Sequence, residues 1–448
     1  MSIFDKKRLT NDTFKLDVER MRRGWYADKY FANIATMLSI LADQGYRYEG
    51  CCHRLPPDVS LDNITPGDIE VEMQWFTRHP GKTVVVGVDK ALEMLRQCSG
   101  YWKDEATFVN TADRLEVWAV HDGNTVTYDG SPLDIQPVMR VRGRYRDFAI
   151  LETSTLGVLT RASRVATNVY ETLIAARGKP LMFFPARFDL HEVQAADGYA
   201  YNIAVQRFNA DYASTIGPFV STDAQGDWWG GAGGGTVAHS AIACFLGDTA
   251  EAMLAFSKVL PLSIPRIALV DFNNNCVADS LRVCKTMFER YRQLIDAGQL
   301  QEAARYKLYG VRLDTSASLR DESTPPLGDP ALDMGVTPRL VFAVRQALDA
   351  AWESWDLPAE WCERAREFCK AVKIVVSGGF NAERIARFEK LAVPVDTYAV
   401  GSALFDNHND TVTDFTADVV RVKVGERWVD LAKVGRRPCD NPDLERVW

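Results

Sequence analysis

One stretch of the sequence decides the fold: Lys373-Ile374-Val375-Val376-Ser377-Gly378-Gly379. Its short apolar run is typical of a strand buried in a parallel sheet, and it ends abruptly in Ser-Gly-Gly before a helix-like segment, Asn381–Leu391. In a barrel of alternating strands and helices, this order places backbone N–H groups and a hydroxyl where the next helix begins. Together with the positive end of that helix, these donors predict a phosphate site.

A second stretch of the same kind, Thr397-Tyr398-Ala399-Val400-Gly401-Ser402, follows after one more helix. Two successive late strands that end in Gly and Ser resemble the phosphate site found after the last two strands of such barrels. The predicted phosphate-binding residues are therefore Ser377, Gly378, Gly379, Gly401 and Ser402.

Working outward from these two stretches, apolar strands alternate with amphipathic helices from about residue 155 onward. The expected strands are Leu181–Phe184, Pro218–Ser221, Ile267–Asp271, Tyr309–Asp314, Lys373–Ser377 and Asp396–Val400. The expected helices are Glu192–Phe208, Asp248–Leu260, Cys276–Ala297, Thr337–Trp355 and Asn381–Leu391. This order predicts a parallel sheet covered by helices, most economically an α/β barrel. Because fewer than eight strands are clear, we expect the barrel to be irregular and incomplete.

The segments on either side of the barrel have a different, mixed pattern. The N-terminal part predicts a helix and a strand followed by a second helix, and then a β-hairpin around an Asp-Gly turn. These segments are Tyr26–Gln44, Thr83–Val88, Asp89–Cys98, and the hairpin strands Leu115–Val120 and Thr125–Tyr128. Alternating segments return at Asp418–Val424 and Arg427–Leu431, which we expect to rejoin this layer. The predicted domains are an α+β domain of residues 1–154 with 405–448, and a barrel domain of residues 155–404.

Composition limits the class of protein. A hydrophobic fraction of 47% and a charged fraction of 25% are those of a globular protein with a large core. The net charge of −8 argues against a nucleic-acid or anionic-membrane partner. Nine cysteines without a Cys-x-x-Cys pair fit a reducing compartment. The charged N-terminus and the lack of a long apolar run predict a cytoplasmic protein.

Polar residues follow several of the predicted strands, where active sites of α/β barrels collect. Carboxylates placed there accept hydrogen bonds from sugar hydroxyls or bind Mg²⁺, and a guanidinium suits a carboxylate or a phosphate. For each residue alone, a structural ion pair remains an equal alternative; taken together they indicate a ligand site. The residues are Arg187, Thr222, Asp271, Arg312 and Asp314.

A glycine-rich segment, Gly230–Gly235, precedes His239 at the start of a short apolar run. The glycines let the backbone approach a ligand closely or simply form a mobile loop. A histidine at a helix start is either structural or, beside a phosphate site, a phosphate ligand or a phosphorylation site. Both alternatives remain open from the residues alone.

Several segments occur in the order of a known family: Gly24–Phe31, Pro137–Thr153, Ser163–Thr167, Gly235–Ser240, Ile267–Asp271, Gly310–Thr315 and Ser377–Gly379. On these segments the chain resembles the nicotinate phosphoribosyltransferases, especially their shorter archaeal and bacterial branch. The resemblance implies an irregular α/β barrel that binds the phosphoribosyl group, and a second layer built from both chain ends. It also implies transfer of the phosphoribosyl group from 5-phosphoribosyl 1-pyrophosphate to nicotinate in NAD biosynthesis, with Mg²⁺ and with ATP as co-substrate.

The resemblance also assigns roles. The expected enzyme is a homodimer with active sites at the subunit interface, where Tyr30, with Phe31 beside it, would reach the neighbouring subunit's substrate. His239 takes the place of a histidine thought to be phosphorylated by ATP. It counts as a catalytic residue with Asp271 and Asp314. Arg187, Thr222 and Arg312 join the phosphate-binding residues as substrate ligands, and the metal ligands remain unassigned.

One departure from the family concerns the end of the first barrel strand. The family has two arginines there, whereas Arg187 is followed by Phe188. Substrate choice is therefore open: quinolinate would demand more basic residues, and nicotinamide would need no carboxylate partner. A further alternative is a catalytically silent phosphate-binding paralogue.

Overall fold

The computed structural model describes residues 3, 5–52, 54–407 and 412–448, and the chain divides into two compact units. The first unit comprises residues 1–170, 199–212 and 406–448, and the second comprises 171–198 and 213–405. The chain passes from the first unit to the second within the long helix α5 (Glu152–Ala175). In the described part of the chain, no helix is long and apolar enough to cross a membrane.

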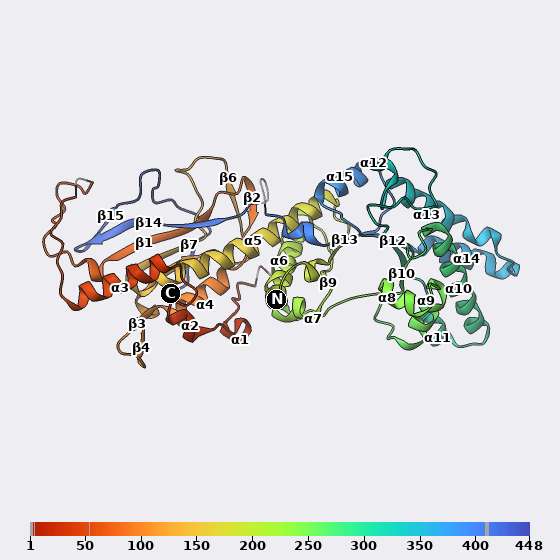
Figure 1. Cartoon of the computed structure of the whole chain (residues 1–448), viewed down its shortest axis with the longest axis horizontal. Coiled ribbons are helices and arrows are strands. Elements are labelled where there is room, and N and C mark those ends of the chain that lie inside the picture. The colour runs from red at the N-terminus through yellow and green to blue at the C-terminus, as the bar shows by residue number, and fades with distance from the viewer. Residues whose placement is uncertain (1–2, 4, 53, 408–411) are drawn as a thin grey trace. The chain divides into compact units, whose positions relative to one another are not determined.

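The first unit contains a six-stranded antiparallel sheet with the order β15-β14-β1-β7-β5-β16. Two smaller sheets, β2-β6 and β3-β4, complete its strands. Figure 1 shows helices α3, α4 and α5 on one side of β1, β7 and β14. The strands are β1 (Glu70–Thr77), β2 (Gly81–Val84), β3 (Gly100–Trp102), β4 (Phe108–Asn110), β5 (Glu116–Ala119), β6 (Thr125–Tyr128), β7 (Met139–Arg144), β14 (Phe415–Val424), β15 (Arg427–Asp430) and β16 (Glu445–Arg446). The helices that begin in this unit are α1 (Asn11–Phe14), α2 (Val18–Arg22), α3 (Lys29–Asp43), α4 (Val88–Cys98) and α5.

The core of this unit lies between the large sheet and helix α4. Alternate residues of β1, such as Met73 and Trp75, are buried against apolar residues of α4, including Leu92 and Leu95. Strand β14 pairs with β1 along almost its full length, with Ala417 opposite Trp75. The prediction that the C-terminal tail rejoins the N-terminal layer is therefore confirmed.

The predicted β-hairpin around Gly123 is wrong. Strand β5 pairs with β7 on one side and with β16 on the other, so neither of its edges is free for β6. Strand β6 pairs instead with β2 in a separate sheet. The Asp-Gly turn itself exists, but the Asp122 carboxylate accepts a 2.8 Å hydrogen bond from the Val88 N–H at the start of α4. This hydrogen bond connects the turn to the start of helix α4.

The second unit contains six parallel strands in the order β10-β11-β12-β13-β8-β9. All six predicted strands are present, and their buried residues explain the continuous apolar runs. The order is open rather than closed, which confirms an irregular, incomplete α/β barrel in a chain that also contains a second layer built from both chain ends. The strands are β8 (Leu181–Phe183), β9 (Phe219–Val220), β10 (Ile267–Leu269), β11 (Gly310–Leu313), β12 (Lys373–Val376) and β13 (Thr397–Val400).

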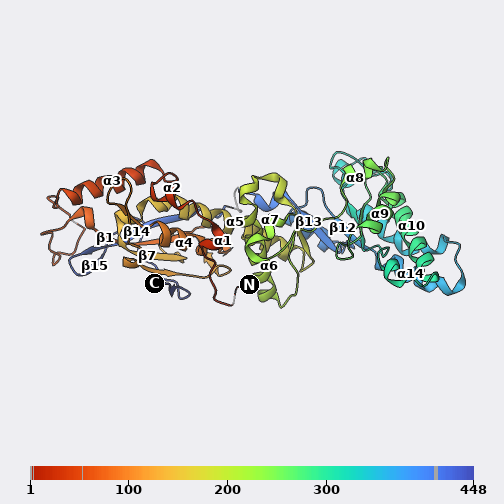
Figure 2. The same cartoon turned by 90° about the horizontal axis from the view of Figure 1, so that it is seen from below.

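Helices connect these strands close to the predicted positions. Figures 1 and 2 both place α9, α10 and α14 together in this unit. Helix α14 was not predicted, although its buried residues Trp361, Ala365 and Cys369 recur at helical spacing. The helices are α6 (Gln194–Tyr212, which ends in the first unit), α7 (Asp223–Gly226), α8 (His239–Cys244), α9 (Thr249–Val259), α10 (Cys276–Asp296), α11 (Leu300–Ala304), α12 (Pro330–Asp333), α13 (Pro338–Ala350), α14 (Ala359–Ala371) and α15 (Ala382–Lys390).

Candidate active site

The carboxyl ends of the six parallel strands meet at one edge of the sheet in the second unit, because all six run in the same direction. Each strand is followed there by a residue that was predicted from the sequence to belong to the site. In sheet order these residues are Asp271, Asp314, Ser377, Gly401, Arg187 and Thr222.

A direct hydrogen bond joins the ends of β11 and β12. The Ser377 hydroxyl donates to Asp314 Oδ1 at 2.7 Å, and its backbone N–H donates to the Leu313 carbonyl at 2.9 Å. Ser377 is buried. Its hydroxyl therefore orients the Asp314 carboxylate, which is a more specific role than the phosphate contact predicted from the sequence.

The Gly378–Gly379 turn requires glycine. Gly378 has φ +88° and Gly379 has φ +70°, a left-handed conformation that side chains rarely adopt. A Cβ added at Gly378 would also lie 3.3 Å from Asp314 Oδ1. Two residues later, the Asn381 side chain accepts the Arg384 N–H at 2.8 Å and begins helix α15. The turn thus places backbone that carries no side chains at the start of helix α15.

Arg384 supports this turn through its carbonyl oxygens, a role that no sequence motif indicates. Its Nη1 donates to the carbonyl oxygens of Gly378 and Gly379 at 2.7 and 3.2 Å, and its Nη2 donates to the Val336 carbonyl at 2.7 Å. Within a trans peptide the N–H points opposite to the carbonyl. The N–H groups of these two peptides therefore point away from Arg384.

His239 and Asp271 form the second polar pair of the site. His239 begins helix α8, and its Nε2 lies 3.0 Å from each carboxylate oxygen of Asp271, which follows β10. Burial raises the pKa of the Asp271 carboxyl, the hydrogen bond from His239 opposes that shift, and the negative charge of Asp314 adds to it. Asp271 and Asp314 follow neighbouring strands, β10 and β11, and their charges interact.

The guanidinium groups of Arg187 and Arg312 lie near this edge, and both have N–H donors that form no hydrogen bond with the described residues. Among the described residues, Arg187 makes no hydrogen bond or ion pair, and its guanidinium lies 5.3 Å from the centroid of the Phe188 ring. Arg312 donates one long hydrogen bond of 3.5 Å to the Val237 carbonyl, and its buried Nε has no partner in the described part of the chain. Burial lowers the pKa of Arg312; the carboxylates of Asp314 and Asp271 oppose the shift, while the charge of Arg187 adds to it. Both groups are suited to an anionic ligand.

The hydroxyl of Thr222 is already used within the fold. It caps helix α7 by accepting the Gln225 N–H and donates to Gln194 Oε1 at 2.8 Å. Ser402 begins a short 3₁₀ turn after β13 and is exposed. The glycine-rich segment is not a free loop, because Gly234 donates its N–H to the Val220 carbonyl at 2.7 Å beside β9.

Tyr30 and Phe31 lie in the first unit, at the start of α3. Tyr30 is 58% exposed, and its hydroxyl donates a long hydrogen bond of 3.4 Å to Asp28. Phe31 is buried and contacts the Tyr30 ring at a centroid distance of 4.3 Å. Only Tyr30 therefore presents its ring to solvent, with Phe31 supporting it.

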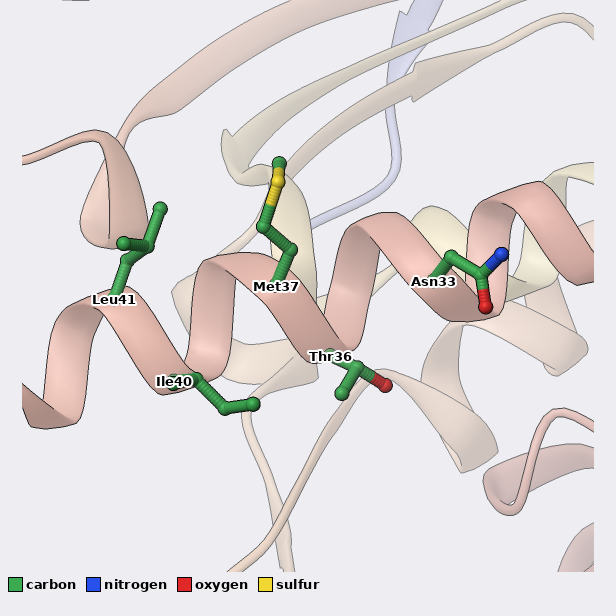
Figure 3. A pocket seen from close by; sticks show the side chains of 5 residues that line it. All are labelled: Asn33, Thr36, Met37, Ile40 and Leu41. Carbon is green, nitrogen blue, oxygen red and sulfur yellow. The ribbon is translucent and has the colours of Figure 1, made fainter.

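A shallow hollow of about 390 Å³ lies further along the same helix (Figure 3). It contains none of the predicted site residues and no charged side chain, and its lining residues are Asn33, Thr36, Met37, Ile40 and Leu41. Within the described ranges, no group of three or more His, Cys, Asp or Glu side chains is placed to hold a metal ion.

Comparison with known proteins agrees with this fold. Residues 58–163 match the family model for the quinolinate phosphoribosyl transferase N-terminal domain. The crystal structure of nicotinate-nucleotide pyrophosphorylase from Pyrococcus furiosus is 24% identical, with a TM-score of 0.61 over 94% of this chain and 79% of that chain. Human nicotinic acid phosphoribosyltransferase is 17% identical, with a TM-score of 0.54 over 88% and 74% of the two chains. No match was found among curated proteins. The resemblance seen in the sequence is confirmed at the level of the fold.

Proposed function

We propose that the protein is a pyridine phosphoribosyltransferase that joins nicotinate to 5-phosphoribosyl 1-pyrophosphate and releases nicotinate mononucleotide and pyrophosphate. The observation that carries the proposal is the link between Ser377 and Asp314. This hydrogen bond joins the glycine turn, whose N–H groups point away from Arg384, to the Asp314 carboxylate. A phosphoribosyl group needs both features close together, the N–H groups for its phosphate and the carboxylate for its ribose. The matched family model and the shared fold support the same class of reaction.

The reaction depends on the relative position of the two substrates more than on proton transfer. The nicotinate ring nitrogen is unprotonated at pH 7 and attacks C1 of the ribose while the bond from C1 to the pyrophosphate oxygen breaks. Positive charge develops on the ribose, and fixed carboxylates stabilise it. Asp314 and Asp271 would supply that negative charge, and the Gly378–Gly379 turn with Gly401 and Ser402 would hold the 5′-phosphate.

Asp271 and Asp314 are the residues that would hold Mg²⁺ together with the substrate. Mg²⁺ is commonly bound by one or two carboxylates together with substrate phosphates, and Asp271 and Asp314 provide two carboxylates at adjacent strand ends. When bound, the ion would neutralise charge on the leaving pyrophosphate.

His239 is the proposed acceptor of a phosphoryl group from ATP. Its Nε2 faces the Asp271 carboxylate, so the ring proton belongs on Nε2 and the lone pair on Nδ1. Nδ1 would attack the terminal phosphorus of ATP, ADP would leave, and Asp271 would stabilise the charged ring. Hydrolysis of this phosphohistidine would couple ATP to the transfer reaction.

The test is product formation. The purified full-length protein is incubated with phosphoribosyl pyrophosphate, Mg²⁺ and nicotinate, quinolinate or nicotinamide, with and without ATP, and the mononucleotides are resolved. Product from nicotinate supports the proposal. Absence of product from every pyridine contradicts it and favours a silent phosphate-binding protein.

Quinolinate is the second candidate acceptor, because the matched family model describes a quinolinate enzyme. Release of CO₂ with the mononucleotide would distinguish it, since quinolinate must lose its 2-carboxylate to give the same product. We also propose a homodimer in which Tyr30 reaches the partner's substrate, because its exposed ring would stack on a pyridine.

A further inference from the structure

We propose that Cys284 and Cys369 form a redox modification site, in which hydrogen peroxide converts the two thiols to a disulfide that joins helix α10 to helix α14. The inference goes beyond the proposed function and does not depend on it. It is drawn from three features: the contact between the two sulfur atoms, the groups around Cys369, and the place of the two helices beside the parallel sheet.

The two sulfur atoms are already in contact. Cys284 lies in α10 and Cys369 in the last turn of α14, and their Sγ atoms are 3.8 Å apart. Both residues are fully buried, so their side chains face each other inside the helical layer. A disulfide has an S–S distance of about 2.05 Å, so the two sulfur atoms must approach by about 1.8 Å. Packed helices shift by this amount in ordinary conformational changes.

The groups around Cys369 favour its thiolate, which is the form that reacts with an oxidant. A hydrogen bond from the Cys284 thiol lowers the pKa of Cys369, and burial opposes this shift. The backbone N–H of Trp352 and the charge of Arg345 lower the pKa further, while the Asp349 carboxylate raises it. The Arg345 guanidinium is held near the thiol because it donates a 3.1 Å hydrogen bond to the Cys369 carbonyl. The same thiol–thiol hydrogen bond raises the pKa of Cys284, and burial adds to that shift.

These surroundings assign different roles to the two thiols. The Cys369 thiolate attacks one oxygen of hydrogen peroxide, the O–O bond breaks, and the departing hydroxide takes up the Cys369 proton to form water. Cys369 is then a sulfenic acid. The sulfur of Cys284 attacks the Cys369 sulfur, the S–O bond breaks, and the departing hydroxide leaves as water with the Cys284 proton. Two thiols and one peroxide thus give one disulfide and two water molecules.

The disulfide would brace the sheet of the second unit. Helix α10 follows β10 and helix α14 precedes β12, and β11 lies between these two strands in the sheet. The two cysteines are separated by 85 positions in the sequence. A crosslink that closes so long a loop restricts the unfolded chain, and this stabilises the folded state. Because both thiols are buried, only a small oxidant that enters through local opening of the helices can reach them.

The test treats the reduced full-length protein with hydrogen peroxide, alkylates the remaining thiols and identifies the proteolytic peptides by mass spectrometry without reduction. We expect a peptide that links Cys284 to Cys369 and that separates on reduction. The melting temperature of the oxidised protein should rise by about 5 °C or more. Glutathione disulfide, which is too large to reach the buried pair, should produce no such link. Cys362→Ser, at a half-buried position of α14, is the control and should keep both the link and the rise.

Two variants test the order of the steps. In Cys284→Ser the resolving thiol is missing, so peroxide should convert Cys369 to its sulfinic acid. In Cys369→Ser the nucleophile is missing, and Cys284 should stay reduced. Oxidation of Cys284 in the second variant, with Cys369 unchanged in the first, would overturn the assignment of the two roles.

The wild-type protein alone decides the inference, even if a variant does not fold. If Cys284 and Cys369 both stay reduced while the exposed Cys51 and Cys244 are oxidised, the pair only fills the core and the inference is overturned. A link that forms without a higher melting temperature overturns the bracing role. None of these measurements uses the proposed activity, so failure of the inference leaves the proposed function standing, and failure of that function leaves the inference standing.

Discussion

The Nε2 atom of His239 lies 3.0 Å from both carboxylate oxygens of Asp271. This symmetric contact orients the ring, and Nδ1 has no hydrogen-bond partner among the described residues. It also joins the start of helix α8 to the end of β10, so a change of either residue alters the site of the proposed phosphoryl transfer.

Replacement of His239 by alanine is expected to abolish the stimulation by ATP, because the proposed phosphoryl acceptor is lost. Asp271→Asn should weaken the stimulation strongly, since an amide no longer favours the proton on Nε2. The measurement is the ratio of initial rates with and without ATP, together with incorporation of phosphate from γ-labelled ATP. Full stimulation in His239→Ala would contradict the assigned role.

Alanine at Gly378 is expected to destabilise the protein by about 1 kcal/mol or more, because of the positive φ and the nearby Asp314 oxygen. It should also raise the KM for phosphoribosyl pyrophosphate. Gly298→Ala is the matched control, since Gly298 has φ +73° with nothing within 4 Å of an added Cβ. The control should lose stability without a change in KM. Equal KM values for the two variants would remove the turn from the site.

Arg384→Gln is expected to raise the KM for phosphoribosyl pyrophosphate more than it lowers kcat, because the carbonyls of the glycine turn lose their donors. Arg384→Lys should restore part of the affinity, since one ammonium can still reach a carbonyl. Arg387→Gln, on an exposed position of the same helix, is the control and should leave KM unchanged. A purely structural role for Arg384 would lower the melting temperature and leave the KM for the donor as it is.

Stability is expected to fall as the pH rises toward 9, in part because of Glu152. Burial raises the pKa of Glu152 to about 8, and the nearby carboxylates of Asp418 and Asp28 add to the shift. In the unfolded chain the pKa is about 4.3, so the folded state holds this proton more tightly. The stabilising contribution is complete below about pH 4 and is lost as the pH rises through about 8.

The measurement is the free energy of unfolding in urea at pH 5, 7 and 9. Glu152→Gln should flatten this part of the pH profile, so that the variant gains on the wild type as the pH rises. Glu426→Gln, on the exposed turn between β14 and β15, is the control and should follow the wild-type profile. Parallel profiles for wild type and Glu152→Gln would refute the assignment.

Mixed dimers test the proposed contribution of Tyr30 from a partner subunit. Tyr30→Ala and Gly379→Val proteins should each be weakly active. If Tyr30 acts on the neighbouring subunit, a hybrid dimer contains one intact site. An equal mixture, after subunit exchange, should then recover about a quarter of the wild-type activity. No recovery in a mixture shown to contain hybrids would place Tyr30 outside the partner's site.

The strands and the glycine turn of the second unit could be predicted from the sequence because local sequence patterns specify them. A strand buried on both faces is a continuous apolar run, and the Ser377-Gly378-Gly379 turn needs glycine for its backbone angles alone. The hairpin prediction failed for the opposite reason. Whether β6 pairs with β5 depends on β7, the next strand along the chain, and on β16, which lies far away in the sequence, because these two strands occupy both edges of β5.

The same limit applies within the candidate site. The strand-end residues could be predicted because parallel strands share one edge, whatever the details of packing. The contact between Phe188 and Gly401 and the support of the turn by Arg384 depend on side-chain positions that no motif specifies. Likewise, the sequence predicts that the Thr222 hydroxyl binds a ligand, but in the structure this hydroxyl forms hydrogen bonds with Gln194 and Gln225.

The pairing of β14 with β1 has a consequence for biosynthesis. Strand β1 is made before the second unit, whereas the strand that lies beside it, with Ala417 opposite Trp75, is made after that unit. The parallel sheet of the second unit, whose strands all precede β14, can assemble while β1 still has an open edge. An unpaired edge of this kind invites association with other chains. Nascent chains stalled before residue 415 should therefore depend on chaperones more than the released protein does.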